Sequence, residues 1–111
     1  MPYFVYCGHD GPGKADVRER IRESHRRFIR IPQPDCRCVA GGPLRDDAGG
    51  GMIGTLLVFD AKDRDCVTRF MAGDPYNQEK LFSNVEIWAW DWGLGQPQGH
   101  DVPGELRGAG D

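Results

Sequence analysis

The sequence predicts a single α+β domain in which helices cover one face of an antiparallel sheet. Three observations support this fold class. Strand-like apolar segments alternate with segments whose apolar residues recur at helical spacing, and Gly- and Pro-rich stretches separate them. The chain also has 111 residues, which suffice for one hydrophobic core but not for two.

The chain begins with a predicted strand and a predicted helix. Residues 3–7 are largely aromatic and β-branched, and the glycines and proline of residues 8–13 end this strand. From Asp16 onward, apolar residues recur every three or four positions, which predicts a helix that ends before Pro32. His25 lies on the apolar face of that helix.

Two further strands and a loop are expected next. Residues 37–40 predict a second strand, which the glycines and proline of residues 41–43 are expected to close. Residues 44–51 are charged and then glycine-rich, so they predict a loop. Residues 54–59 form a nearly continuous apolar run, which is typical of a strand buried on both faces.

The remaining elements are two helices and a last strand. A helix with Phe70 among its inward positions ends at Gly73, a suitable C-terminal cap. Asp74 followed by Pro75 predicts the start of another, short helix, because aspartate caps helices and proline suits the first helical position. Residues 85–92 alternate in polarity and predict the last strand.

The element order is therefore β-α-β-β-α-β with a short extra helix, which is the ferredoxin-like arrangement. We expect this domain to span residues 1–92 and the Gly- and Pro-rich residues 93–111 to form a tail. Helices cover only one face of such a sheet. Trp88, Trp90 and Trp92 are expected to share the other face, which favours a homodimer through the sheet. Cover by the chain's own loop or tail is the alternative.

Charge and cysteine content narrow the class of protein. A net charge of -3 disfavours binding to nucleic acids or to membrane surfaces. The N-terminus lacks the basic region and apolar stretch of a signal peptide, so a cytoplasmic location is expected. Thiols stay reduced there, and we interpret the cysteines as small buried residues rather than disulfides or metal ligands. They are Cys7, Cys36, Cys38 and Cys66.

Several short segments occur in the order and spacing of a known family. They are Tyr3–Tyr6, Arg22–His25, Ala40–Pro43, Gly54–Thr55 and Asp74–Tyr76. Over residues 3–92 the sequence resembles the YCII-related (YciI-like) family. The resemblance implies a ferredoxin-like domain that pairs into a dimeric α/β barrel.

The resemblance also implies a site. In the family, a histidine of the first helix faces the aspartate of an Asp-Pro-Tyr motif, and these positions match His25 and Asp74. A histidine beside a carboxylate is a workable general base, because the carboxylate holds the tautomer and stabilises the imidazolium. The alternative is a core histidine whose hydrogen bond Asp74 satisfies while it caps the short helix.

Three residues are candidates for binding a substrate. Arg22 lies one helical turn before His25, where it would hold an anionic substrate or be one solvated arginine among several. The resemblance favours Asp10, since an acidic residue is common at this position in the family. Tyr76 is expected to line the cleft, with packing in the core as the alternative.

These residues favour proton transfer, in an isomerisation or elimination, on a small aromatic or anionic molecule. No activated nucleophile accompanies His25, and no phosphate-binding glycine motif occurs. We expect no cofactor; a metal bound by His9, Asp10, His25 and Asp74 is the weaker alternative. One member of the family is similar to a dehydrochlorinase that acts on a chlorinated hydroxyhydroquinone. The competing hypothesis is a non-catalytic dimer that binds a small molecule or regulates a partner.

Overall fold

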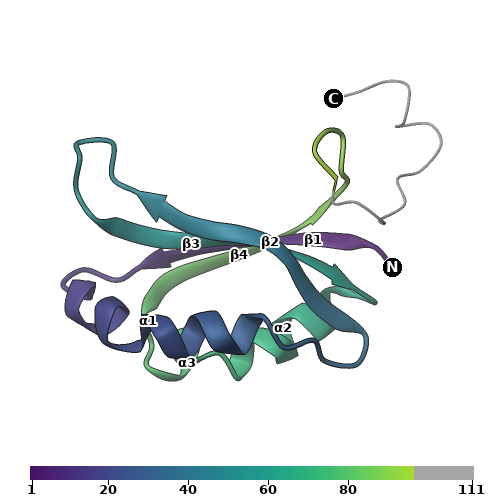
Figure 1. The fold of residues 1–111 in the computed structure, drawn as a ribbon, viewed down its shortest axis with the longest axis horizontal. Coiled ribbons are helices and arrows are strands. Elements are labelled where there is room, and N and C mark those ends of the chain that lie inside the picture. The colour runs from purple at the N-terminus through teal and green to yellow at the C-terminus, as the bar shows by residue number, and fades with distance from the viewer. Residues whose placement is uncertain (97–111) are drawn as a thin grey trace.

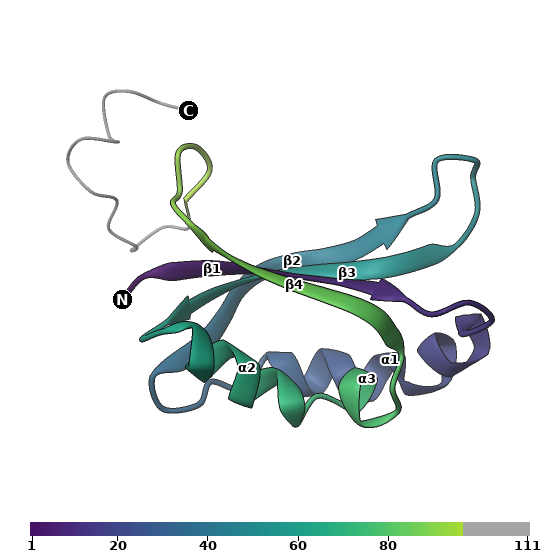
Figure 2. The same ribbon diagram turned by 180° about the vertical axis from the view of Figure 1, so that it is seen from behind.

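The computed structural model describes residues 1–96, which form one antiparallel sheet with helices on a single face (Figures 1 and 2). The strands are β1 (Tyr3–Asp10), β2 (Cys36–Arg45), β3 (Met52–Ala61) and β4 (Phe82–Trp90). The helices are α1 (Ala15–Ile29), α2 (Arg64–Ala72) and α3 (Pro75–Gln78). The strands lie in the order β2-β3-β1-β4, with every neighbouring pair antiparallel.

This arrangement confirms the predicted α+β, ferredoxin-like fold. Most of the predicted tail, residues 97–111, lies outside the described residues. No helix in the described part is long and apolar enough to cross a membrane.

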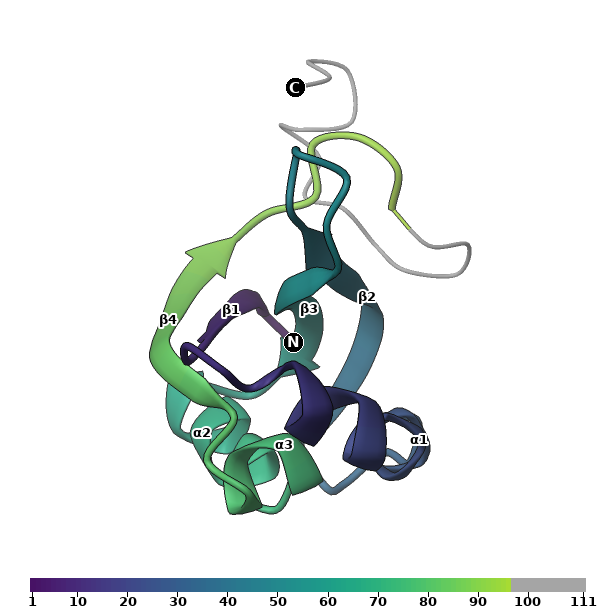
Figure 3. The same cartoon turned by 90° about the vertical axis from the view of Figure 1, so that its left-hand side faces the viewer.

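The main core lies between the sheet and α2. Successive residues of a strand point to opposite faces, so Phe4 and Tyr6 of β1 face the helices together with Leu57 and Phe59 of β3. Phe59 packs edge-on against Phe70 of α2, with their ring centres 5.1 Å apart. The sheet curves around the helices, as Figure 3 shows, and this curvature places α1 beneath β2 and β3.

The second strand is longer than the sequence predicts. Residues 41–43 do not close it, and pairing with β3 continues to Arg45. β2 is an edge strand, where a proline such as Pro43 is tolerated because one side of the strand has no ladder partner. Gly41 is required by close packing: a Cβ there would lie 2.6 Å from Cδ2 of Leu57 and 2.7 Å from the carbonyl oxygen of Leu56.

We therefore expect Gly41→Ala to lower the free energy of unfolding by about 1–3 kcal/mol, as overpacking does in well-packed sites. Gly42→Ala is the matched control, because a Cβ at Gly42 would meet no atom within 4 Å. The control should change stability by less than about 1 kcal/mol. Urea denaturation of both variants measures the difference, and equal stabilities would contradict the packing argument.

The outer face of the sheet carries an apolar cluster, but its tryptophans are not all on the strand. β4 ends at Trp90, and Trp92 lies beyond it, packed against Val58 and edge-on to Tyr3. The last strand therefore ends two residues earlier than predicted, and Trp92 is not part of it, although Trp90 and Trp92 still pack together in this cluster with ring centres 4.6 Å apart. Trp88 remains 60% exposed. Pairing of two copies through this face stays a prediction.

Candidate functional site

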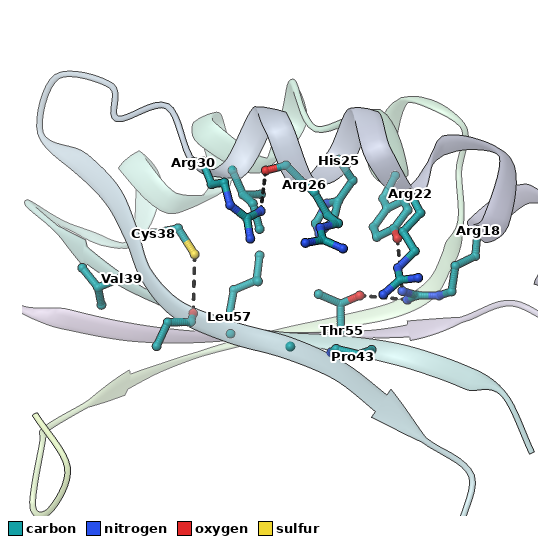
Figure 4. A pocket seen from close by; sticks show the side chains of 15 residues that line it. Arg18, Arg22, His25, Arg26, Arg30, Cys38, Val39, Pro43, Thr55 and Leu57 are labelled. Carbon is teal, nitrogen blue, oxygen red and sulfur yellow. Dashed lines mark hydrogen bonds between the residues drawn. The ribbon is translucent and has the colours of Figure 1, made fainter. Parts of the chain in front are cut away.

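A cleft of about 510 Å³ lies between α1 and the inner side of β2 and β3 (Figure 4). Its size is that of pockets that bind small organic molecules. Side chains of α1 form one wall, and β2 and β3 form the other. The lining residues include Arg18, Arg22, His25, Arg26, Arg30, Cys38, Thr55, Leu57 and Tyr76.

His25 is buried in the cleft wall and hydrogen-bonded to Asp74. Its Nδ1 lies 2.9 Å from Oδ1 and 2.8 Å from Oδ2 of the Asp74 carboxylate. A carboxylate only accepts hydrogen bonds, so Nδ1 carries the proton. Nε2 of a neutral His25 is then an acceptor. Nε2 has no hydrogen-bond partner among the described residues and is not fully buried. It is therefore open to solvent at the cleft, which His25 lines.

Asp74 is fully buried and does not line the cleft itself. It is the N-terminal cap of α3, where its Oδ1 accepts a hydrogen bond of 3.2 Å from the backbone N–H of Tyr76. Pro75 follows at the first helical position, as the sequence predicts. The two alternatives for Asp74 are thus both present: one carboxylate caps the helix and holds His25.

Tyr76 connects His25 to Arg18. The imidazole of His25 stacks on the Tyr76 ring, with centres 3.9 Å apart and planes 13° from parallel. The Arg18 guanidinium lies 4.7 Å from the centre of the same ring and donates to the tyrosine hydroxyl at 3.3 Å. Burial raises the pKa of Tyr76, although Arg18 and Arg22 act in the opposite direction. The phenol therefore stays protonated at neutral pH.

Arg18 is buried and anchored by Asp10. Its Nε donates to Oδ2 of Asp10 at 2.7 Å and its Nη2 to Oδ1 at 2.8 Å, which is a bidentate ion pair. Nη2 also donates to Oγ1 of Thr55 at 2.8 Å. Burial opposes the charge of Arg18, but the hydrogen bond to Asp10 and its other contacts outweigh this and raise its pKa. Asp10 is not among the residues that line the cleft, and its carboxylate holds Arg18.

Three further arginines line the cleft along α1. Arg22, Arg26 and Arg30 follow Arg18 at intervals of four residues, which places them along one side of the helix. Figure 4 shows their side chains extending from α1 toward the sheet. Sequence reasoning found Arg22 but missed the other three, although the four-residue spacing was visible in the sequence.

The remaining candidates do not join this site. His9 is exposed, and its Nε2 lies 3.6 Å from Sγ of Cys7. Cys38 does line the cleft, but burial raises the pKa of its thiol to about 11, so it is not a thiolate at neutral pH. Within residues 1–96, the His, Cys, Asp and Glu side chains form no group of three that could hold a metal ion.

Comparison with known proteins identifies the family. The model of the YCII-related domain matches residues 1–91. The chain belongs to the YCII-related family. A search of curated protein sequences gave no match.

Solved structures resemble this YCII-related protein in fold. A 5-chloro-2-hydroxyhydroquinone dehydrochlorinase from Burkholderia phenoliruptrix AC1100, in complex with 2,5-dihydroxybenzoquinone, is similar at a TM-score of 0.71 and 25% identity. The match covers 79% of this chain and 92% of that one. A conserved protein from Methanosarcina mazei Go1 matches at a TM-score of 0.51 and 12% identity, over 78% of this chain and 89% of that one. The latter likeness concerns the fold alone.

The site of this YCII-related protein thus combines a proton acceptor with positive charge. His25, Tyr76 and Arg22 line the cleft. Asp74 and Asp10 do not line it, but Asp74 holds His25 and Asp10 holds Arg18. Such an arrangement can bind a small molecule and remove a proton from it. It offers no thiolate and no hydroxyl hydrogen-bonded to His25 among the described residues.

Proposed function

We propose that this YCII-related protein is an enzyme that transfers a proton in the elimination or isomerisation of a small, unsaturated ring compound. Nε2 of His25 is the base. The observation that supports this proposal is the hydrogen bond of His25 Nδ1 to the fully buried Asp74, which leaves Nε2 as an acceptor in the cleft. A carboxylate in this place orients the imidazole and stabilises the charge that it gains.

Stacking on Tyr76 supports the same role. It holds the plane of the imidazole, so the direction of the Nε2 lone pair is fixed relative to the cleft. The Tyr76 hydroxyl accepts from Arg18 and keeps its own hydrogen, because burial raises its pKa. The base, His25, and a hydrogen-bond donor, the hydroxyl of Tyr76, therefore belong to one packed network. Proton transfer requires groups that are held in place in this way.

The dehydrochlorinase of similar fold suggests a trial reaction. In a dehydrochlorination the base takes one proton from the substrate, the C–Cl bond breaks and chloride leaves with the bonding electron pair. The organic product gains a double bond, and the protonated base returns its proton to water. This reaction requires a base and a negative charge that stabilises the protonated base. In this proposal His25 is the base and Asp74 carries the negative charge.

The test is chloride release from 5-chloro-2-hydroxyhydroquinone. We expect the protein to accelerate release and His25→Gln to reduce the rate on the order of 10²- to 10⁴-fold, the usual contribution of a general base. Glutamine is chosen because its amide can still donate to Asp74. His9→Gln is the matched control, since His9 is exposed and outside the cleft.

Equal rates for the two variants would contradict the proposal. Binding of 2,5-dihydroxybenzoquinone without any chloride release would favour the alternative, a non-catalytic binding protein that uses the same cleft. Circular dichroism of both variants shows whether a lost rate reflects a lost fold.

A further inference from the structure

The charge of the cleft differs in sign from the charge of the chain. The chain carries a net charge of -3. Yet the residues that line the cleft include four arginines and a histidine, and no aspartate or glutamate. Clustered charge of one sign in a cleft attracts ligands of the other sign.

Arg18 does not contribute to this excess. The carboxylate of Asp10 neutralises it through the bidentate ion pair. Two more of its N–H groups donate to Thr55 and Tyr76, so four of its five donors bind the protein. The free positive charge must therefore come from the arginines further along α1.

Arg22 is the least committed of these arginines. It is half-buried, and no hydrogen bond or ion pair holds its guanidinium among the described residues. Within residues 1–96, the side chain of Arg26 makes a single long ion pair, 3.7 Å, with the exposed Glu23. Arg30 donates to the backbone carbonyl of Arg26 at 2.7 Å and keeps its charge. A half-buried guanidinium without a partner points to a ligand that pairs with it.

The spacing of these charges matches a small molecule. Arg22 and Arg26 are four residues apart, about 6 Å along the helix axis, and His25 lies between them in the sequence. Apolar side chains, including Leu57 and Ile29, complete the lining. The cleft thus offers positive charge and a proton acceptor on the same helix, α1, with an apolar surface beside them.

We propose that the natural ligand is a small organic acid, a flat apolar frame that carries at least one carboxylate. Arg22 binds the carboxylate through its planar fork, and Arg26 assists or binds a second acidic group. This inference deepens the proposed function, because it takes the reacting atom to lie at Nε2 of His25. The planar guanidinium matches a carboxylate in two parallel hydrogen bonds.

The structure favours a carboxylate over a phosphate. Phosphate sites commonly use backbone N–H groups at a helix N-terminus or in a glycine-rich loop. Here the positive groups are side chains from the middle and the end of α1, and residues 15–17 at its start do not line the cleft. The apolar lining also provides contact for a carbon frame that inorganic phosphate lacks.

Calorimetric titrations with three probes test this inference. The probes are 2,5-dihydroxybenzoate, hydroquinone (the same ring without the carboxylate) and inorganic phosphate. We expect the acid to bind at least about tenfold more tightly than hydroquinone, because a charged hydrogen-bonded pair contributes that much. Arg22→Gln should weaken binding of the acid by about tenfold or more and leave hydroquinone unchanged. The affinity of Arg22→Lys for the acid should lie between the affinities of the wild type and of Arg22→Gln.

Arg27→Gln is the matched control. Arg27 is exposed on the same helix and does not line the cleft, so the variant removes the same charge without touching the site. An equal loss in Arg22→Gln and Arg27→Gln would overturn the inference, and so would equal affinities for the acid and hydroquinone. Phosphate binding as tight as that of the acid would overturn it as well.

The outcome is independent of catalysis by His25. The probes are titrated as ligands, and the same titration of His25→Gln should still show the preference for the acid. If that variant binds the acid but chloride release never depends on His25, the proposed function fails and the ligand class stands. If release depends on His25 but hydroquinone binds as well as the acid, the ligand class fails alone.

Discussion

Arg18→Met is expected to lower the free energy of unfolding by about 3–5 kcal/mol, the cost of removing one partner from a buried ion pair. The side chains of Arg18 and Asp10 are only 5% and 8% exposed. Methionine fills similar volume but donates no hydrogen bond. The carboxylate of Asp10 would then remain buried without its counter-charge, and this desolvated charge is the main source of the loss.

Two neutral groups lose a donor in the same variant. Oγ1 of Thr55 and the hydroxyl of Tyr76 both accept from Arg18, and both residues are buried. Each buried acceptor left without a partner costs on the order of 1–3 kcal/mol unless its hydroxyl rotates to another partner. The tyrosine stack that holds His25 should also loosen, so the variant tests whether Arg18 supports the site.

Urea denaturation of Arg18→Met measures this loss, with Arg20→Met as the matched control. Arg20 lies on the same helix and pairs with Glu79, but the two side chains are 61% and 46% exposed. Exposed pairs contribute less than about 1 kcal/mol, so the control should unfold near the wild type. The double variant Asp10→Asn with Arg18→Met should recover part of the loss, because it removes the unpaired charge. Equal stabilities of the two single variants would show that the buried pair contributes nothing.

Local patterns in the sequence predicted most of the fold. Alternation and helical spacing depend on neighbours along the chain, and therefore located the strands, α1 and α2. The end of β2 could not be predicted this way. Gly41, Gly42 and Pro43 usually break a strand, but here β3 supplies hydrogen bonds on one side and the open edge accepts the proline. The end of β4 was misplaced for a related reason, since Trp92 lies beyond the strand and packs against Val58 of the same sheet, a contact that neighbours along the chain do not reveal.

Local sequence patterns also predicted the site only where its residues carry local signals, and not where they depend on contacts across the fold. His25, Asp74 and Tyr76 were found because short motifs carry them, and Asp74 with Pro75 also has a local capping signal. Asp10 was found, but its partner was not. Asp10 pairs with Arg18 from the position just after a β-bulge or similar irregularity between His9 and Asp10, where the register of β1 with β4 shifts. Bulges redirect side chains in ways that a strand pattern does not reveal.

Asp74→Asn is expected to reduce the rate of the proposed reaction on the order of 10²- to 10⁴-fold while the protein stays folded. Asparagine caps helices about as well as aspartate, so α3 should keep its first turn. The change therefore acts on His25 and not on the fold. It removes the charge that the imidazolium would face and also changes the partner of Nδ1.

The geometry predicts which way the new amide would turn. Oδ1 of Asp74 accepts from the backbone N–H of Tyr76, and only an oxygen can take that place in the variant. The NH₂ group then occupies the position of Oδ2, 2.8 Å from Nδ1 of His25, whereas the amide oxygen stays 2.9 Å from the same nitrogen. A hydrogen on Nδ1 would therefore meet the hydrogens of the NH₂ group at the shorter of the two distances. Nδ1 becomes an acceptor, and the ring proton moves to Nε2. The nitrogen that faces the cleft would then donate, and it could not remove a proton.

Nitrogen NMR shifts of His25 report this change directly, because protonated and unprotonated ring nitrogens resonate far apart. We expect the signal of the wild type to show a proton on Nδ1 and that of Asp74→Asn to show it on Nε2, with chloride release lost in parallel. Asp63→Asn is the matched control: Asp63 caps α2 by accepting from the N–H of Cys66 at 2.9 Å, away from the cleft. A tautomer switch without loss of rate would exclude Nε2 as the base, whereas loss of rate without a switch would assign the role of Asp74 to its charge alone.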